Sequence, residues 1–215
     1  MNIHPKFRVF GERRPVGYSD RDILSDVQFM LSEIESIYGP MVQEWFSRFV
    51  VFADESAPCV YYPDGFPQTV GIRIVMPALK DVDYARFQMA HELVHCLAPA
   101  GKDCNGNIIP ASVIGEAVAV KYQCSYLHKR MNHAKRKISI KGTGYDDALR
   151  LYNEFTHLGK GLVRQIRQIE PYFHKWNHET FIAAGMHVPE SLERKLLMKF
   201  DDFRKEHCHA NVSSR

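Results

Sequence analysis

The hydrophobic pattern of this sequence changes its period near residue 82, and this change limits the chain to one fold class. Between residues 48 and 76, three short segments rich in β-branched and aromatic residues are separated by Pro, Gly and Asp. Such segments are typical of strands, and their short connections favour a small antiparallel sheet. From Val82 onward, the apolar residues recur almost only at helical spacing. A small sheet followed by a mostly helical half predicts an α+β fold.

Amphipathic helices are predicted before and after these strands. The first covers residues 19–38, with Ser19 as its N-cap and Gly39-Pro40 at its end. Its apolar face is predicted to consist of Ile23, Val27, Met30, Leu31, Ile34 and Tyr38. Later helices are expected at residues 82–97, 110–131, 145–157, 162–169 and 190–204.

The length of 215 residues suits one domain, so we expect a single domain over residues 1–215. Residues 1–17 are expected to form an extended arm and residues 207–215 a flexible tail. No apolar run reaches the roughly 18–20 residues that span a bilayer, and no signal-peptide pattern opens the sequence. Five cysteines without paired spacing are typical of reduced thiols. These features predict a cytoplasmic protein without a membrane partner.

The charge of the chain does not favour nucleic acid as a partner. The formal net charge is +3, which is too small to imply nucleic-acid binding by itself. Residues 129–141 form the one basic segment, with six Lys and Arg residues. Such a segment is usually a solvated helix end or loop, and a phosphate- or partner-binding patch is the alternative.

The predicted helix at 82–97 carries the segment His91-Glu92-Leu93-Val94-His95. Residues four apart lie on one face of a helix, so both imidazoles can bind a single metal ion. Glu92 flanks the pair and is expected to act as general base toward a water whose pKa the ion lowers. This is the pattern of the H-E-x-x-H metalloprotease motif. The opposite face is apolar, which predicts a half-buried helix.

A third metal ligand is predicted on the next helix. Glu116 is the only ionisable side chain between Ile108 and Val120. A buried carboxylate costs several kcal/mol unless it is paired or bound to a cation, so a salt bridge to Lys or Arg is the alternative. Glu116 follows His95 by 21 residues, enough for a loop and a returning helix. His91, His95 and Glu116 would then match the ligand count of a catalytic site for one zinc ion per chain.

Other third ligands fit the sequence less well. The metzincin pattern requires glycine where Ala98 stands, and no histidine follows at the required spacing. The segment Gly142–Asp147, "GTGYDD", contains the residue types of an aspzincin element at the wrong spacing. Glu116 is therefore the predicted ligand.

The sequence resembles the gluzincin branch of zinc metallopeptidases and, within it, the ImmA/IrrE-type peptidases. The similar segments lie between residues 70 and 127 and read "GIRIVMPA", "YARFQMAHELVHCL" and "EAVAVKYQCSYL". The resemblance implies a zincin-like domain with zinc ligands His91, His95 and Glu116 and with Glu92 as the base. It also implies a regulatory protein as a substrate. Val94 departs from the family pattern, which commonly has glycine there.

We therefore expect a zinc-dependent endopeptidase that hydrolyses a protein or peptide. The alternatives are a catalytically inactive zincin-like binding or regulatory module and a metal-dependent hydrolase of a non-peptide substrate. A peptidase also needs a group that stabilises the oxyanion. The candidates are Tyr145, Tyr152, His157, His174 and His178. If the strand at 70–76 lies at a sheet edge, an extended substrate could pair with it.

Overall fold

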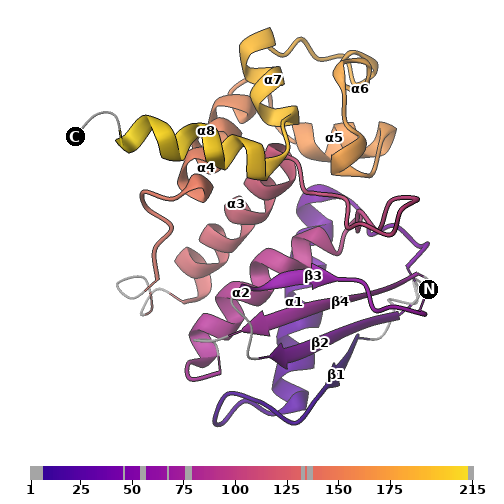
Figure 1. The fold of residues 1–215 in the computed structure, drawn as a ribbon, viewed down its shortest axis with the longest axis vertical. Helices are drawn as coiled ribbons and strands as arrows, with labels where there is room; N and C mark the ends of the chain where they lie inside the picture. Colours follow the sequence, from indigo (N-terminus) through magenta and orange to yellow (C-terminus); the bar gives the residue numbers. More distant parts are fainter. Residues whose placement is uncertain are drawn as a thin grey trace. The chain divides into compact units, whose positions relative to one another are not determined.

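The computed structural model describes residues 7–45, 47–53, 57–66, 68–75, 79–131, 134 and 138–212. In this part of the chain, eight α-helices and one four-stranded open sheet form a mixed α+β fold, as predicted (Figure 1). The chain divides into two compact units. Unit 1 comprises residues 1–36, 40–99 and 122–138, and unit 2 comprises residues 37–39, 100–121 and 139–215.

The sheet belongs to unit 1 and has the strand order β1-β2-β4-β3. Its strands are β1 (Phe7–Phe10), β2 (Ser47–Ala53), β3 (Cys59–Tyr61) and β4 (Thr69–Val75). The β1–β2 and β2–β4 pairs are parallel, and only the β3–β4 pair is antiparallel. The prediction of an antiparallel sheet was therefore wrong. Helix α1 (Asp20–Tyr38) connects β1 to β2, and such a crossover lets the two strands run parallel.

The sheet has two edge strands, β1 and β3. The segment predicted to be an extended arm contributes β1. The predicted edge strand at 70–76 corresponds to β4, which lies between β2 and β3. An extended substrate therefore cannot pair with the part of β4 that β3 covers, from Gly71 to Arg73.

The core of unit 1 contains buried apolar side chains from α1, β2 and β4. All six residues of the predicted apolar face of α1 are buried, so this prediction is confirmed. Val50 on β2 and Ile72 on β4 are register partners and are also buried. Ser19 Oγ accepts a hydrogen bond from Asp22 N at 3.3 Å, as expected of an N-cap.

A charged side chain also lies inside this core. Arg48 on β2 is only 2% exposed, and its Nη2 donates to Val42 O at 3.2 Å. Its Nε and Nη1 atoms have no hydrogen-bond partner in the described part of the chain. Burial lowers the pKa of Arg48, and the nearby Cys96 and Glu35 oppose this shift.

Unit 2 is helical. It contains α4 (Gly144–Thr156), α5 (Leu162–Ile169), a 3₁₀ turn η2 (Phe173–Lys175), α6 (His178–Ala183), α7 (Glu190–Leu197) and α8 (Phe200–Val212). The single helix predicted at 190–204 is therefore two helices. Met198 O accepts from Val113 N at 2.8 Å, and Phe200 N donates to Ala111 O at 2.9 Å. Between the end of α7 and the start of α8, these backbone groups thus form hydrogen bonds with residues 111 and 113 instead of continuing one helix.

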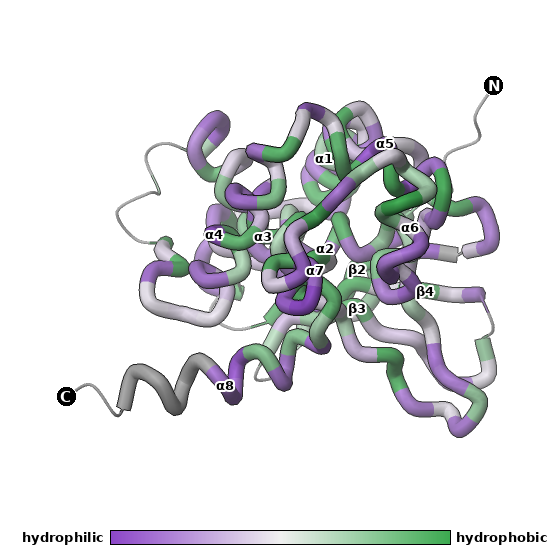
Figure 2. Tube along the Cα trace, turned by 90° about the horizontal axis from the view of Figure 1, so that it is seen from above, coloured by the Kyte–Doolittle hydropathy of each residue, from purple (hydrophilic) through white to green (hydrophobic). Residues whose placement is uncertain are grey.

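Helix α8 reaches into the segment that was expected to be a flexible tail, because it continues to Val212. Hydrophobic and hydrophilic residues alternate along its first turns (Figure 2). Phe200 and Phe203 are buried, whereas Asp201 and Asp202 are exposed. This pattern is that of an amphipathic helix with one packed face.

Two other expectations concern partners. Three residues of the predicted basic segment, Lys135, Arg136 and Lys137, lie outside the described residues. Nucleic-acid binding by this segment stays a prediction. Among the helices that the structure describes, each is too short or too polar to cross a membrane.

Candidate metal centre

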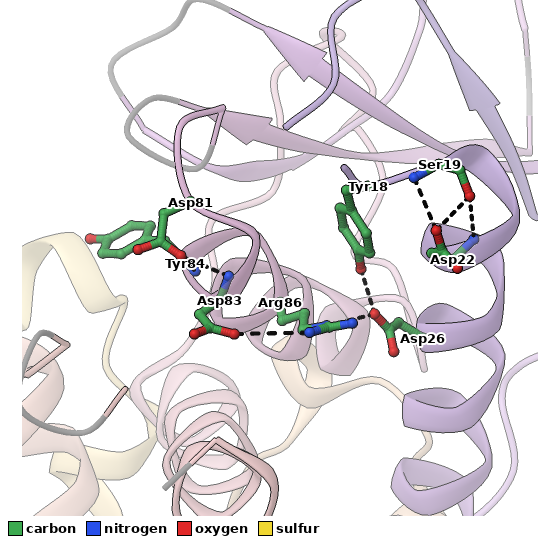
Figure 3. Close-up of polar contacts among 8 residues, drawn as sticks. All are labelled: Tyr18, Ser19, Asp22, Asp26, Asp81, Asp83, Tyr84 and Arg86. Atoms are coloured by element: carbon green, nitrogen blue, oxygen red, sulfur yellow. Dashed lines mark hydrogen bonds and ion pairs between the residues drawn. The ribbon is translucent and has the colours of Figure 1, made fainter. Parts of the chain in front are cut away.

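The H-E-x-x-H segment lies on helix α2 (Val82–His95). The start of this helix is fixed by its N-cap residue, Asp81. The carboxylate of the N-cap Asp81 accepts from Asp83 N at 2.9 Å and from Tyr84 N at 3.4 Å (Figure 3). The predicted apolar face of α2 is buried, but Gln88, His91 and Glu92 are buried as well. The helix is thus enclosed on more sides than the half-buried helix that was predicted.

Side chains of α2 hold it against both α1 and the sheet. Arg86 Nε donates to Asp26 Oδ2 of α1 at 2.7 Å, and Tyr18 OH donates to the same oxygen at 2.7 Å (Figure 3). On another side, Gln88 Oε1 accepts from Val75 N at the end of β4, at 3.0 Å. These bonds restrict the movement of α2 within unit 1.

Glu116 lies on helix α3 (Val113–Arg130), through which the boundary between the two units passes. Residues 113–120 are buried, as the sequence predicted, and Glu116 itself is 8% exposed. The second half of α3 forms hydrogen bonds with α1 and α2 in unit 1. Tyr122 OH donates to Met30 O of α1 at 3.3 Å, and Gln123 Nε2 donates to Phe87 O of α2 at 3.0 Å.

His91, His95 and Glu116 form a group that could hold a metal ion. Each offers one ligand atom, and these atoms all lie within 4.8 Å of one another. The Nε2 atoms of His91 and His95 are 3.2 Å apart. Two nitrogens bound to tetrahedral zinc at about 2.0–2.1 Å would be about 3.3 Å apart. The histidine pair therefore already has the separation that a shared ion requires.

The surroundings of this group also suit a cation. His91 and Glu116 are buried, so the carboxylate lies where an uncompensated negative charge is costly. Two imidazoles and one carboxylate are a common donor set for catalytic zinc. Burial raises the pKa of the neighbouring Cys96 to about 12, so this residue remains a thiol at neutral pH. The residues present thus fit a divalent ion with nitrogen and oxygen ligands.

Glu92 is not one of the three candidate ligands. It lies on α2 between the two histidines in sequence and is 4% exposed. Among the described residues, the group that could hold an ion does not include it. This is compatible with the role of a base rather than a ligand.

The tyrosines predicted as oxyanion stabilisers lie on α4 in unit 2 and have other contacts. The ring of Tyr145 lies 5.0 Å from that of Phe200. Tyr152 is buried, and its ring lies 5.9 Å from Lys121 Nζ. Burial raises the pKa of Tyr152. These contacts give both tyrosines a packing role, and their catalytic role stays a prediction.

The three candidate histidines lie in unit 2 as well. His157 follows α4, and its Nδ1 contacts Asn153 O. His174 lies in η2, where burial lowers its pKa. His178 is exposed, and its Nδ1 lies 3.0 Å from a carboxylate oxygen of Glu193. An oxyanion role for any of them stays a prediction.

Searches of protein-family models, of curated proteins and of solved structures found no match to this chain. The resemblance to gluzincins accordingly stays a prediction. The functional argument rests on the group formed by His91, His95 and Glu116 and on the helices that hold it.

Proposed function

We propose that the protein is a zinc-dependent endopeptidase. The observation that carries this proposal is the proximity of His91, His95 and Glu116, whose ligand atoms all lie within 4.8 Å of one another. The intact H-E-x-x-H pattern on α2 supports a hydrolase rather than a structural site, because structural zinc sites usually have four protein ligands and favour cysteine. The resemblance to gluzincin peptidases supports a peptide substrate.

In this proposal, His91, His95 and Glu116 hold one zinc ion. The ion would supply Lewis acidity, which lowers the pKa of water to about 7 and polarises a carbonyl. Glu92 would take a proton from the attacking water onto a carboxylate oxygen and later pass it to the amine nitrogen of the leaving group. General acid–base catalysis of this kind contributes about 10²–10⁴-fold to a rate. The burial of Glu92 protects this proton transfer from bulk water.

The proposal is tested by comparing the wild type with Glu92→Gln and Glu116→Ala. We would measure bound zinc by elemental analysis and proteolysis with fluorescently labelled, unfolded casein. Glu92→Gln should keep the zinc and lose about 10²–10⁴-fold in kcat, because the amide cannot accept the proton. Glu116→Ala should lose affinity for zinc.

Glu179→Gln is the matched control, since it makes the same carboxylate-to-amide change at an exposed position of α6. It should keep both zinc and activity. Wild-type protein that binds no zinc, or Glu92→Gln protein with full activity, would refute the proposal.

A further inference from the structure

The hydrogen bond between Gln123 and Phe87 joins the two helices that carry the candidate metal ligands. Gln123 is only 6% exposed, and its Nε2 donates to Phe87 O at 3.0 Å. In an α-helix, the carbonyl of residue 87 also accepts the backbone N–H of residue 91. The side chain of Gln123 thus binds α3 to the very turn of α2 that presents His91.

The positions of these residues along the two helices match the positions of the ligands. Glu116 precedes Gln123 by seven residues, which is about 10.5 Å along α3 and within about 20° of the same face. On α2, His91 and His95 lie about 6 Å and 12 Å beyond Phe87. Gln123 meets Phe87, while Glu116, earlier on α3, has its ligand atom within 4.8 Å of those of the histidines, which come later on α2. These contacts are those of two helices that run in opposite directions.

We infer that Gln123 is a positioning residue that sets the axial register of α3 against α2 and so places Glu116 within reach of the metal held by His91 and His95. This inference rests on the proposed metal site, not on the proposed peptidase activity. A shift of α3 by one residue would move the carboxylate by about 1.5 Å along the helix axis. Metal–ligand distances hold to within about 0.2 Å, so a small error of register would weaken the site.

Other bonds of α3 do not fix this register in the same way. Tyr122, next to Gln123 in sequence, donates to Met30 O and Glu33 Oε2, which both belong to α1. It therefore ties α3 to a helix that carries none of the three candidate ligands. The two neighbouring residues offer a matched comparison, since each loses buried hydrogen bonds when its polar group is removed.

The test is to measure metal affinity in Gln123→Met and Tyr122→Phe. Methionine has nearly the size of glutamine but cannot donate a hydrogen bond. We would determine the dissociation constant for zinc by competition with a chromophoric chelator and record the visible absorption of the cobalt-substituted proteins. Gln123→Met should weaken zinc binding by about 10–100-fold, as is typical when a group that orients a ligand is lost, and should change the cobalt spectrum.

Tyr122→Phe should lower the stability of the protein to a similar extent but keep the affinity for zinc within about threefold and leave the cobalt spectrum unchanged. Equal losses of affinity in the two variants would mean general loosening of α3 and would overturn the inference.

A double-mutant cycle with Glu116→Ala gives a second test. If Gln123 acts through Glu116, then Gln123→Met should have little further effect on zinc affinity once Glu116 is removed. A full and independent loss in the double variant would overturn the inference.

Enzymatic activity is not needed for any of these measurements. A wild type that binds zinc, together with a Glu92→Gln variant of full activity, would refute the peptidase proposal and leave the role of Gln123 supported or refuted by the affinities alone. A wild type that binds neither zinc nor cobalt would refute both.

Discussion

Replacing the buried Arg48 with methionine is expected to stabilise the protein. Two of its guanidinium nitrogens, Nε and Nη1, lack hydrogen-bond partners in the described part of the chain, and the side chain is 2% exposed. Each unsatisfied buried donor costs about 1–3 kcal/mol, so the two together cost about 2–6 kcal/mol. The bond from Nη2 to Val42 O returns about 1.5–3 kcal/mol, since it involves a charged group.

The midpoints of these ranges, about 4 and about 2 kcal/mol, predict that Arg48→Met raises the free energy of unfolding by about 2 kcal/mol, in line with replacements of buried ion pairs by apolar side chains. The assay is urea unfolding followed by circular dichroism. Arg8→Met is the control, because Arg8 lies on the neighbouring strand β1 and is exposed. It should change the stability by less than about 0.5 kcal/mol. A loss of stability in Arg48→Met would refute the reasoning, because it would show that the guanidinium has favourable interactions that outweigh its burial.

Two further predictions concern the ion and the protonation of histidines. If His91, His95 and Glu116 bind zinc, a free zinc concentration of 100 times the dissociation constant should stabilise the wild type by about 2.7 kcal/mol. A chelator should abolish this gain in thermal unfolding. A wild type that melts at the same temperature with and without the chelator would contradict this prediction. In an NMR titration, His174 should show a pKa below 6.5 because of burial, and His178 a pKa above 6.5 because of its hydrogen bond to Glu193. The contribution of His174 to stability is therefore lost as the pH falls from about 6.5 through its lowered pKa, and that of His178 is lost as the pH rises through its raised pKa. Equal pKa values for the two histidines would refute this assignment, and Glu193→Gln should return only His178 to its ordinary value.

Hydrophobic periodicity predicted the helices that carry the site. The buried face of α1, the helix of the H-E-x-x-H segment and the apolar surroundings of Glu116 were all visible as spacing and composition. The proximity of Glu116 to the two histidines followed from the cost of burying a carboxylate without a counter-charge. These features depend on local sequence or on a strong physical penalty, and both can be recognised in one sequence.

Features that depend on backbone partners distant in sequence were missed. Strand β1 has only four residues, and without it α1 could not be recognised as a crossover between parallel strands. The break between α7 and α8 depends on bonds to the backbone of Ala111 and Val113, which leave no pattern in the segment that breaks. Gln123 was overlooked for the same reason. Its spacing of seven from Glu116 was visible, but its partner is a backbone carbonyl.

The path of the unit boundary through α3 has a consequence for protein synthesis. Neither unit is a continuous segment, since residues 122–138 belong to unit 1 together with residues 1–36 and 40–99. In a growing chain, both histidines of the proposed metal site are made before Glu116, which follows His95 by 21 residues. At a synthesis rate of about 5–20 residues per second, this delay is about 1–4 s. During it the nascent chain has two of the three proposed zinc ligands, and the proposed centre is incomplete until α3 has been made.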